Sequence, residues 1–327
     1  MFEGDILASP REPLDLAGLR RRIDLETANG YRSLRRSLTP DYARVRRDIA
    51  FGYMTLTAIL LCVSIPQGLA SGLVAAALGA IAVGYGIAYL QLFIHEAAHF
   101  NLAPDRAVND RMANRLICWQ VGTDIAAYRR THADHHRYLG RAGDTEVSYT
   151  RPLTARFLLE MLTGVHALRV FLGRGRGDAA PARAAASRAP LARGAAAHLA
   201  IMATLLALGA WPAALAWAGG VGVAFPFFAT IRQLLEHRPT AVVADLTEGA
   251  NEGAVTRLFD DGLFARTLGG AGFNRHLLHH LEPQVSYTRL AELEGFLLNT
   301  SARAALDARR STYFAAFKEL WAHDRRH

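Results

Sequence analysis

Three short clusters of histidine are the part of this sequence best suited to do chemistry. They read His-Glu-Ala-Ala-His, His-Ala-Asp-His-His and His-Leu-Leu-His-His, and they hold eight of the thirteen histidines. Residues three and four apart share one face of a helix, so each cluster directs two or three imidazoles the same way. Neutral imidazole binds zinc, copper, iron and nickel. The pattern predicts a metal site built from His95, His99, His132, His135, His136, His276, His279 and His280.

The number of candidate ligands favours two metal ions over one. A structural zinc takes four protein ligands and a catalytic zinc takes three, so eight histidines are too many for a single ion. His237, at the end of the second long apolar stretch and beside the third cluster, is a ninth candidate. The remaining histidines stand alone, and we expect them to be structural or solvated: His166, His198, His323 and His327.

Two long stretches without charge predict membrane spans. Residues 49–94 and 194–231 contain no Asp, Glu, Lys or Arg, and each is about twice the ~20 residues needed to cross a bilayer. Pro66-Gln67-Gly68 and Trp211-Pro212 interrupt them near the middle. We therefore expect two helical hairpins, with spans at about 49–65, 71–94, 195–210 and 213–233. Two buried core hairpins of a soluble protein are the alternative, which would need two charge-free runs of this length.

The distribution of arginine predicts the orientation of these spans. The turns at 66–70 and 211–212 carry no charge, whereas arginines crowd the segments before the first hairpin and between the two. By the positive-inside rule, both termini and residues 95–193 are expected on the cytoplasmic side. The net charge of +8 is explained in this way, and because no nucleic-acid module accompanies it we expect no nucleic-acid partner.

The rest of the chain is expected to divide simply. Residues 1–48 form a basic cytoplasmic N-terminal segment that does not read as a signal peptide, 49–301 the catalytic membrane domain, and 302–327 a C-terminal amphipathic helix. Within the domain, 113–130 and 152–172 are predicted as helices at the membrane interface, and 173–193 as a linker. Cys62 and Cys118 have no CxxC partner, so neither a disulfide framework nor a cysteine metal site is expected.

One competing motif lies in the first cluster. His95-Glu96-Ala97-Ala98-His99 matches the H-E-x-x-H signature of zinc proteases, in which the glutamate is the general base. An intramembrane zinc protease would leave the second and third clusters unexplained, and no Asp-Gly pair in a later span supplies a third ligand. It remains a distant alternative.

The three clusters together resemble the histidine boxes of the membrane fatty acid desaturase and hydroxylase superfamily. The resemblance covers roughly residues 45–300 and extends to Gly143-Asp144, Asn274 and the run from His279 to Pro283. It implies an all-α membrane fold, with four transmembrane helices in two hairpins and a cytoplasmic helical cap holding two irons. It also implies nine histidine ligands, which are the eight box histidines and His237.

Two departures bear on the substrate. Where acyl-CoA desaturases carry an asparagine before the ninth histidine, this chain has Gln233, and its first box is one residue shorter than theirs. Both favour an acyl group linked to a lipid or another carrier. The expected reaction is desaturation with O2, and hydroxylation by a related enzyme is the alternative. We expect no fused cytochrome b5-like domain, and we therefore expect electrons from a separate ferredoxin or cytochrome with its reductase.

Several polar residues are candidates to support the ligands. A carboxylate that accepts the distal N–H of a ligating imidazole fixes its tautomer and orientation. The carboxylates placed for this are Glu96, Asp134, Asp144, Glu146 and Glu236, and the amides considered with them are Gln233 and Asn274.

Overall fold

The computed structural model describes residues 14–66, 68–139, 144–145, 147–173, 188–238 and 256–324, and these are mostly helical. The chain divides into two compact units. Unit 1 comprises residues 1–41, 133–152 and 233–327, and unit 2 comprises 42–132 and 153–232. Two of the boundaries between the units fall inside helices, one in α6 (Ile125–Tyr138) and one in α12 (Phe225–His237). Each of these two helices therefore contributes residues to both units.

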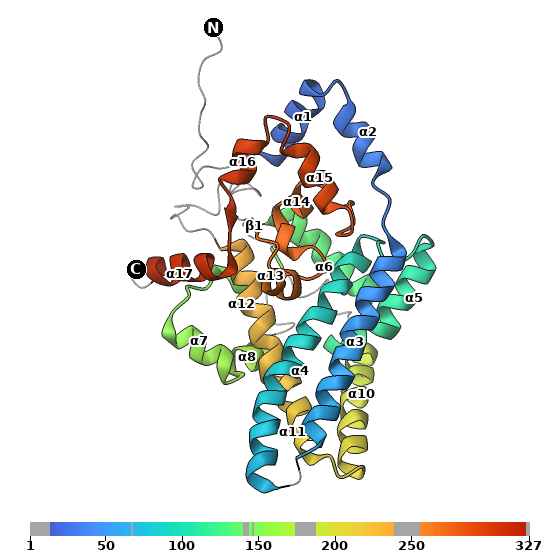
Figure 1. Cartoon of the computed structure of the whole chain (residues 1–327), viewed down its shortest axis with the longest axis vertical. Helices are drawn as coiled ribbons and strands as arrows, with labels where there is room; N and C mark the ends of the chain where they lie inside the picture. Colours follow the sequence, from blue (N-terminus) through green and yellow to red (C-terminus); the bar gives the residue numbers. More distant parts are fainter. Residues whose placement is uncertain are drawn as a thin grey trace. The chain divides into compact units, whose positions relative to one another are not determined.

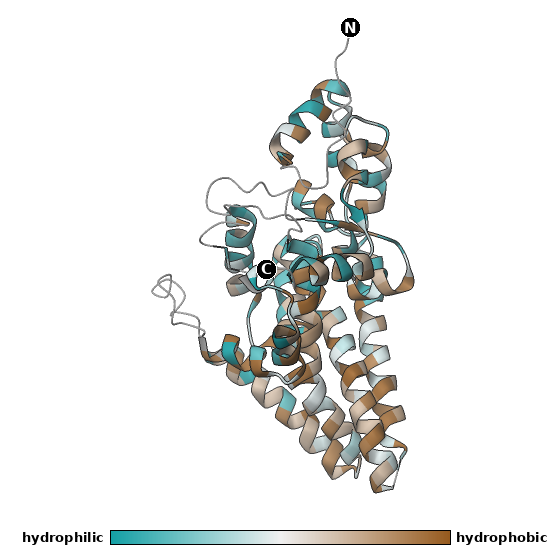
Figure 2. Ribbon diagram, turned by 90° about the vertical axis from the view of Figure 1, so that its left-hand side faces the viewer, coloured by the Kyte–Doolittle hydropathy of each residue, from teal (hydrophilic) through white to brown (hydrophobic). Residues whose placement is uncertain are grey.

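Unit 2 is built on two helical hairpins. The first pairs α3 (Tyr42–Ser64) with α4 (Leu69–Ala98), and the second pairs α10 (Arg188–Ala207) with α11 (Trp211–Gly219). The helix α4 packs against both α3 and α11 (Figure 1). Four helical stretches are long and apolar enough to cross a membrane: Tyr42–Ser64, Leu69–Ala98, Arg188–Ala207 and Trp211–His237. Hydrophobic residues dominate the lower parts of the long helices in Figure 2. The predicted all-α fold with four spanning helices is confirmed.

The length of α4 explains how it can both span a membrane and present a metal ligand. Its 30 residues rise about 45 Å, against an apolar layer of about 30 Å. The last turns of the helix can therefore lie beyond the hydrocarbon, and His95 is in the last turn. Gly84 lets α4 approach its neighbour closely, because a Cβ there would lie 2.6 Å from the backbone nitrogen of Phe225.

The spans begin and end at residues other than those predicted. The helix α3 starts at Tyr42 and includes Arg44, Arg46 and Arg47, because charge marks the edge of the apolar layer and not the end of a helix. The fourth span extends to His237 and contains a π-helical turn, Gly220–Ala224. Pro226, which has no N–H for the regular helical bond, lies two residues after the last residue of this turn.

Both predicted interface helices are broken, and the predicted linker is partly helical. Residues 113–130 contain the end of α5 (Arg106–Leu116), the short helix Cys118–Val121 and the start of α6. Gly122 is left-handed between them, at φ +62°. Residues 152–172 form α7 (Ala155–Leu162) and α8 (Val165–Gly173), separated by Gly164 at φ +75°. Residues 174–187 of the linker lie outside the described residues, but α10 already begins at Arg188.

Unit 1 is an assembly of short helices around its own core. In chain order its elements are α1 (Leu16–Glu26), α2 (Gly30–Ser37), the 3-10 turn Val147–Thr150, β1 (Leu258–Phe259), α13 (Leu263–Leu268), the 3-10 turn Phe273–Arg275, α14 (His276–Leu281), α15 (Leu290–Leu297), α16 (Arg303–Asp307), β2 (Arg310–Ser311) and α17 (Tyr313–Asp324). The strands pair in parallel, with Leu258 opposite Arg310 and Phe259 opposite Ser311. The prediction of one helix over 302–327 is therefore wrong: the chain turns into β2, and α17 begins only at Tyr313.

Candidate metal centre

Four buried histidines of unit 1 point their ring nitrogens toward one another. His135 lies on α6, His237 ends α12, and His276 and His280 are one turn apart on α14. All four are buried, and each offers one ring nitrogen within 4.8 Å of the others. The Nε2 atom of His276 is 2.8 Å from Nε2 of His237 and 3.2 Å from Nε2 of His280. Segments far apart in the sequence thus bring four imidazoles to one point.

These distances suit ligands of a shared metal ion. Metal–imidazole bonds are about 2.1 Å long, so neighbouring ligand atoms are about 3.0 Å apart at a right angle and about 3.4 Å apart at the tetrahedral angle. A metal also requires neutral imidazoles. Burial lowers the pKa of His280 well below its ordinary value, and the neighbouring histidines lower it further. The residues present therefore fit a metal ion of the kind that imidazoles bind.

A carboxylate and a phenol fix the orientation of His135. The Nδ1 atom of His135 is 2.9 Å from Oδ1 of Asp144, which is itself buried. The hydroxyl of Tyr149 donates to the other carboxylate oxygen at 2.5 Å. A hydrogen bond from Nδ1–H to Asp144 places the ring's lone pair on Nε2 of His135. Among the carboxylates proposed from the sequence, Asp144 is placed as this role demands.

Unit 1 holds two further histidines of the predicted set. The Nε2 atoms of His136 and His279 lie 2.9 Å apart, so this pair has the separation of two ligands of one ion. His136 follows His135 on α6, and His279 precedes His280 on α14. The second and third clusters therefore meet within unit 1.

Unit 2 gathers the other three histidines. The Nε2 atoms of His99 and His132 are 2.9 Å apart, and the ring of His95 lies 4.5 Å from that of His132 between centroids. Tyr128 stacks on His132 with nearly parallel rings, at an angle of 9°. Burial lowers the pKa of His99 well below its usual range, and His132 and Arg129 reinforce the shift. The first cluster and the start of the second are thus brought together within unit 2.

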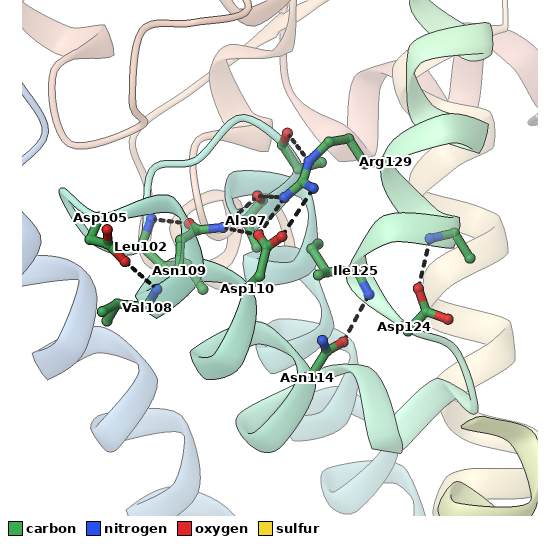
Figure 3. Close-up of polar contacts among 12 residues, drawn as sticks. Ala97, Leu102, Asp105, Val108, Asn109, Asp110, Asn114, Asp124, Ile125 and Arg129 are labelled. Carbon is green, nitrogen blue, oxygen red and sulfur yellow. Dashed lines mark hydrogen bonds and ion pairs between the residues drawn. The ribbon is translucent and has the colours of Figure 1, made fainter. Parts of the chain in front are cut away.

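Arg129 fastens the end of α4 between the two histidines of the first cluster (Figure 3). Its guanidinium donates to the carbonyls of Ala98, at 3.0 Å, and Ala97, at 3.2 Å. It also pairs with Asp110 at 2.6 Å, which lowers the pKa of that carboxyl. Carbonyls at a helix C-terminus lack partners within the helix, so the bond from Arg129 satisfies the carbonyl of Ala98 and adds a further donor to that of Ala97.

Asn109 and Phe100 make further contacts at the C-terminal end of α4. The Asn109 amide donates to the carbonyl of Ala97, and its oxygen accepts from the backbone of Leu102, each at 3.0 Å (Figure 3). Phe100, directly after His99, has the left-handed φ of +62°. Such a conformation is costly for a residue with a side chain, and the Arg129 guanidinium lies 3.9 Å from the centre of the Phe100 ring. The chain is therefore held in a sharp turn just after the first box.

The other proposed carboxylates are placed less directly. Glu96 is buried, with an oxygen 3.9 Å from Nδ1 of His95. Glu236 is buried and accepts a hydrogen bond from the hydroxyl of Tyr313 at 3.0 Å. Asp134 is half-buried on α6, and Glu146 lies outside the described residues.

The two amides differ in what surrounds them. The Asn274 side chain donates to a carboxylate oxygen of Asp261 at 3.0 Å and lies near the carbonyl of Asp260. Gln233 is half-buried in the last turns of α12. A role of either amide at a metal stays a prediction.

Three of the isolated histidines have other surroundings. The Nε2 atom of His198 is 3.1 Å from the carbonyl oxygen of Gln120, and His166 packs edge-on against Phe157. His323 lies beside Asp324, with Nδ1 3.1 Å from a carboxylate oxygen. These contacts agree with a structural interpretation, and His327 lies outside the described residues.

Sequence reasoning missed the side chains that support the ligands from outside the clusters. Tyr149 and Phe273, which stacks on His276 at 4.9 Å between centroids, carry no signal in the sequence. Arg129 carried a weak signal in the sequence, because it lies three residues before His132 and therefore on the same side of the helix. Its partners, the carbonyls at the end of α4, could not be found from a pattern of side chains.

Four apolar helices able to cross a membrane, together with groups of buried imidazoles, define an all-α membrane protein equipped to bind metal. The family model for fatty acid desaturases matches residues 71–309, which include all three histidine clusters. The chain therefore belongs to the fatty acid desaturase family, whose members are oxidoreductases acting on lipids in membranes. A search among curated proteins found no match.

Proposed function

We propose that this protein is a membrane-bound di-iron oxidoreductase that introduces a double bond into the acyl chain of a lipid. The observation that carries the proposal is the group of four buried imidazoles in a chain of the desaturase family, one of them oriented by Asp144. A zinc protease would use only the first cluster and is not supported by this family. The acyl group is proposed to be linked to a lipid.

The nine histidines are proposed to bind two ions. His135, His237, His276 and His280 would bind one iron, because their nitrogens already have the separations of ligands around a single ion. The remaining five would supply the ligands of the second: His95, His99, His132, His136 and His279. Ligand number supports this division, since four or five imidazoles satisfy one ion and nine do not.

Each of the protein groups has a definable task at such a site. When bound, two ferrous irons supply the reductive activation of O2 that is needed to attack an unactivated methylene. Burial favours the neutral form of His99 and His280 by lowering the pKa of each, and Asp144 holds the proton of His135 on Nδ1, away from the metal. Tyr149 in turn orients Asp144. Burial also keeps bulk water from the ligands, which strengthens the electrostatic interactions around them.

The balanced reaction requires an outside source of electrons. Desaturation converts –CH2–CH2– and O2, with two electrons and two protons, into –CH=CH– and two water molecules. Hydroxylation uses the same reactants but leaves one oxygen on carbon as an alcohol and releases one water molecule. Both outcomes are compatible with the ligand set, and desaturation is the one proposed. The electrons would come from a separate ferredoxin or cytochrome and its reductase.

Reconstitution tests the proposed function. The iron-loaded protein in lipid vesicles, supplied with O2, ferredoxin and its reductase, is expected to yield an acyl chain lacking two hydrogen atoms, detected by mass spectrometry. A chain carrying one extra oxygen atom would instead identify a hydroxylase. Turnover that persists without O2, or cleavage of a peptide bond, would overturn the proposed class.

The proposed topology has its own test. Both termini and the segment between the hairpins are proposed to face the cytoplasm, because arginines crowd these parts of the sequence and are absent from the two turns. Reporter proteins fused after Gly173 and at the C-terminus should both be active on the cytoplasmic side. Opposite results at the two positions would rule out the paired hairpins proposed here.

A further inference from the structure

The helix that carries the third histidine cluster cannot hold its own position. The helix α14 has six residues, His276–Leu281, and helices this short are unstable without tertiary contacts. Its leucines, Leu277 and Leu278 with Leu281, are fully buried in the core of unit 1. Whatever packs against these leucines therefore sets the rotation of the helix and the direction of its histidines.

The N-terminal helices supply a large part of that packing. Leu16, Leu19 and Ile23 of α1 and Tyr31 of α2 are buried in the same core as the leucines of α14, and α1 contacts α14 directly. Both N-terminal helices precede residue 71, where the match to the desaturase family begins. An element outside the matched region thus packs against the third histidine box.

A buried polar contact adds direction to this packing. Glu282, the residue directly after α14, is only 7% exposed, and its Oε1 accepts two hydrogen bonds. The hydroxyl of Tyr31 donates at 2.8 Å and the guanidinium of Arg35 at 2.7 Å. Tyr31 itself is 0% exposed. Hydrogen bonds to a carboxylate are short and strong, so the C-terminus of α14 is fixed at a defined point on α2.

The same N-terminal segment is tied down at further points after the third cluster. The backbone N–H of Asp41 donates to the hydroxyl of Thr288 at 3.0 Å, and Arg289 donates to the carbonyl of Thr39 at 2.8 Å. The backbone N–H of Ser301 donates to the carboxylate of Glu26 at 3.0 Å. The segment from α1 to residue 41 therefore follows the chain from Glu282 to Ser301 closely.

We propose that α1 and α2 are a positioning element of the metal centre: Tyr31 and Arg35, by holding Glu282, fix the rotation of α14 and so direct His276, His279 and His280 at the metal. The inference rests on the proposed function, since it assigns these helices to the same site. Tyr31, Arg35 and Glu282 are positioning residues and would touch neither substrate nor metal.

Metal binding by the full-length, metal-free protein in detergent tests the inference without turnover. Co²⁺ is the probe, followed by its visible absorption bands, which report both affinity and ligand geometry. Glu282→Gln and Tyr31→Phe, which keep size and remove the charge or the donor, are expected to weaken Co²⁺ binding about tenfold, as loss of support for metal ligands does elsewhere. The absorption bands should also shift. Arg36→Met is the matched control, because Arg36 is the exposed neighbour of Arg35, and it should bind as the wild type does.

A second variant separates positioning from general loss of stability. Leu306→Ala removes buried apolar surface from α16 in the same core but leaves α1, α2 and the contacts of Glu282 intact. If it changes the Co²⁺ bands as much as Glu282→Gln does, or if Glu282→Gln and Tyr31→Phe bind Co²⁺ with unchanged affinity and bands, the positioning role is overturned. Failure of the wild-type protein to bind Co²⁺ would instead remove the proposed function itself.

Discussion

The two units hold their histidines by different means. In unit 1 the ring of a single ligand is fixed: Asp144 accepts from His135, and Tyr149 holds Asp144. In unit 2 Arg129 acts on the backbone, binding the carbonyls of Ala97 and Ala98 and thereby the helix end that carries the first box. Asp144 fixes the ring of one ligand, whereas Arg129 fixes the end of the 30-residue helix that carries the first box. The two arrangements should therefore respond differently to mutation.

The largest effect is expected from removing a ligand of unit 1. His280→Ala or His237→Ala should abolish detectable turnover and lower the iron content from two ions per chain toward one, while the protein still inserts into membranes. Insertion depends on the apolar helices and not on the metal. Elemental analysis of the purified protein measures this change. Full activity of His237→Ala would exclude it as the ninth ligand.

Removing the support of one ring should come next. Asp144→Asn is expected to weaken metal binding about 10- to 100-fold, because the amide cannot accept a charge-assisted hydrogen bond from His135. Asp134→Asn, on the same helix as His135 but only half-buried, is the matched control and should have little effect. Competition with a chelator gives both affinities. Equal losses in the two variants would mean that Asp144 has no special role.

Removing the backbone clamp of unit 2 should act mainly through stability. Arg129→Met breaks the ion pair with Asp110 and leaves the carbonyl of Ala98 open, at a cost of about 2 kcal/mol. Arg129→Lys, which lacks the planar guanidinium group, should retain only part of the stability that Arg129→Met loses. Arg130→Met, at the exposed neighbouring position, is the control. Thermal unfolding of the metal-free proteins in detergent makes the comparison, and equal stability of the two methionine variants would contradict it.

The smallest effect is expected from acid. The pKa of His280 is held well below 6.5 in the folded protein, so below pH 6.5 the unfolded chain gains a proton that the folded site refuses. The free energy of unfolding of the metal-free protein should therefore fall by up to about 1.4 kcal/mol for each pH unit below pH 6.5. Above pH 6.5, His280 should contribute no pH dependence. His280→Ala should flatten the profile. An unchanged profile in that variant would place the pH dependence elsewhere.

The sequence by itself determined the features that are local. A charge-free run long enough to cross a bilayer carries its own signal, and so the four spanning helices were predicted. Three histidines at helical spacing likewise share a face wherever the helix lies. Helix ends were predicted less well, because α3 continues through Arg44 to Arg47 and the expected interface helices break at Gly122 and Gly164. Those limits depend on caps and turns, not on hydropathy.

Only the tertiary structure decided which side chains support the ligands. Several carboxylates were equal candidates in the sequence, and folding placed Asp144 against His135 and Glu236 against Tyr313. The contact of Tyr31 with Glu282 joins positions 251 residues apart, and no pattern within either segment encodes it. Hydropathy and helical spacing describe what a segment can do alone, whereas a hydrogen bond between distant segments exists only once the packing of both has been settled.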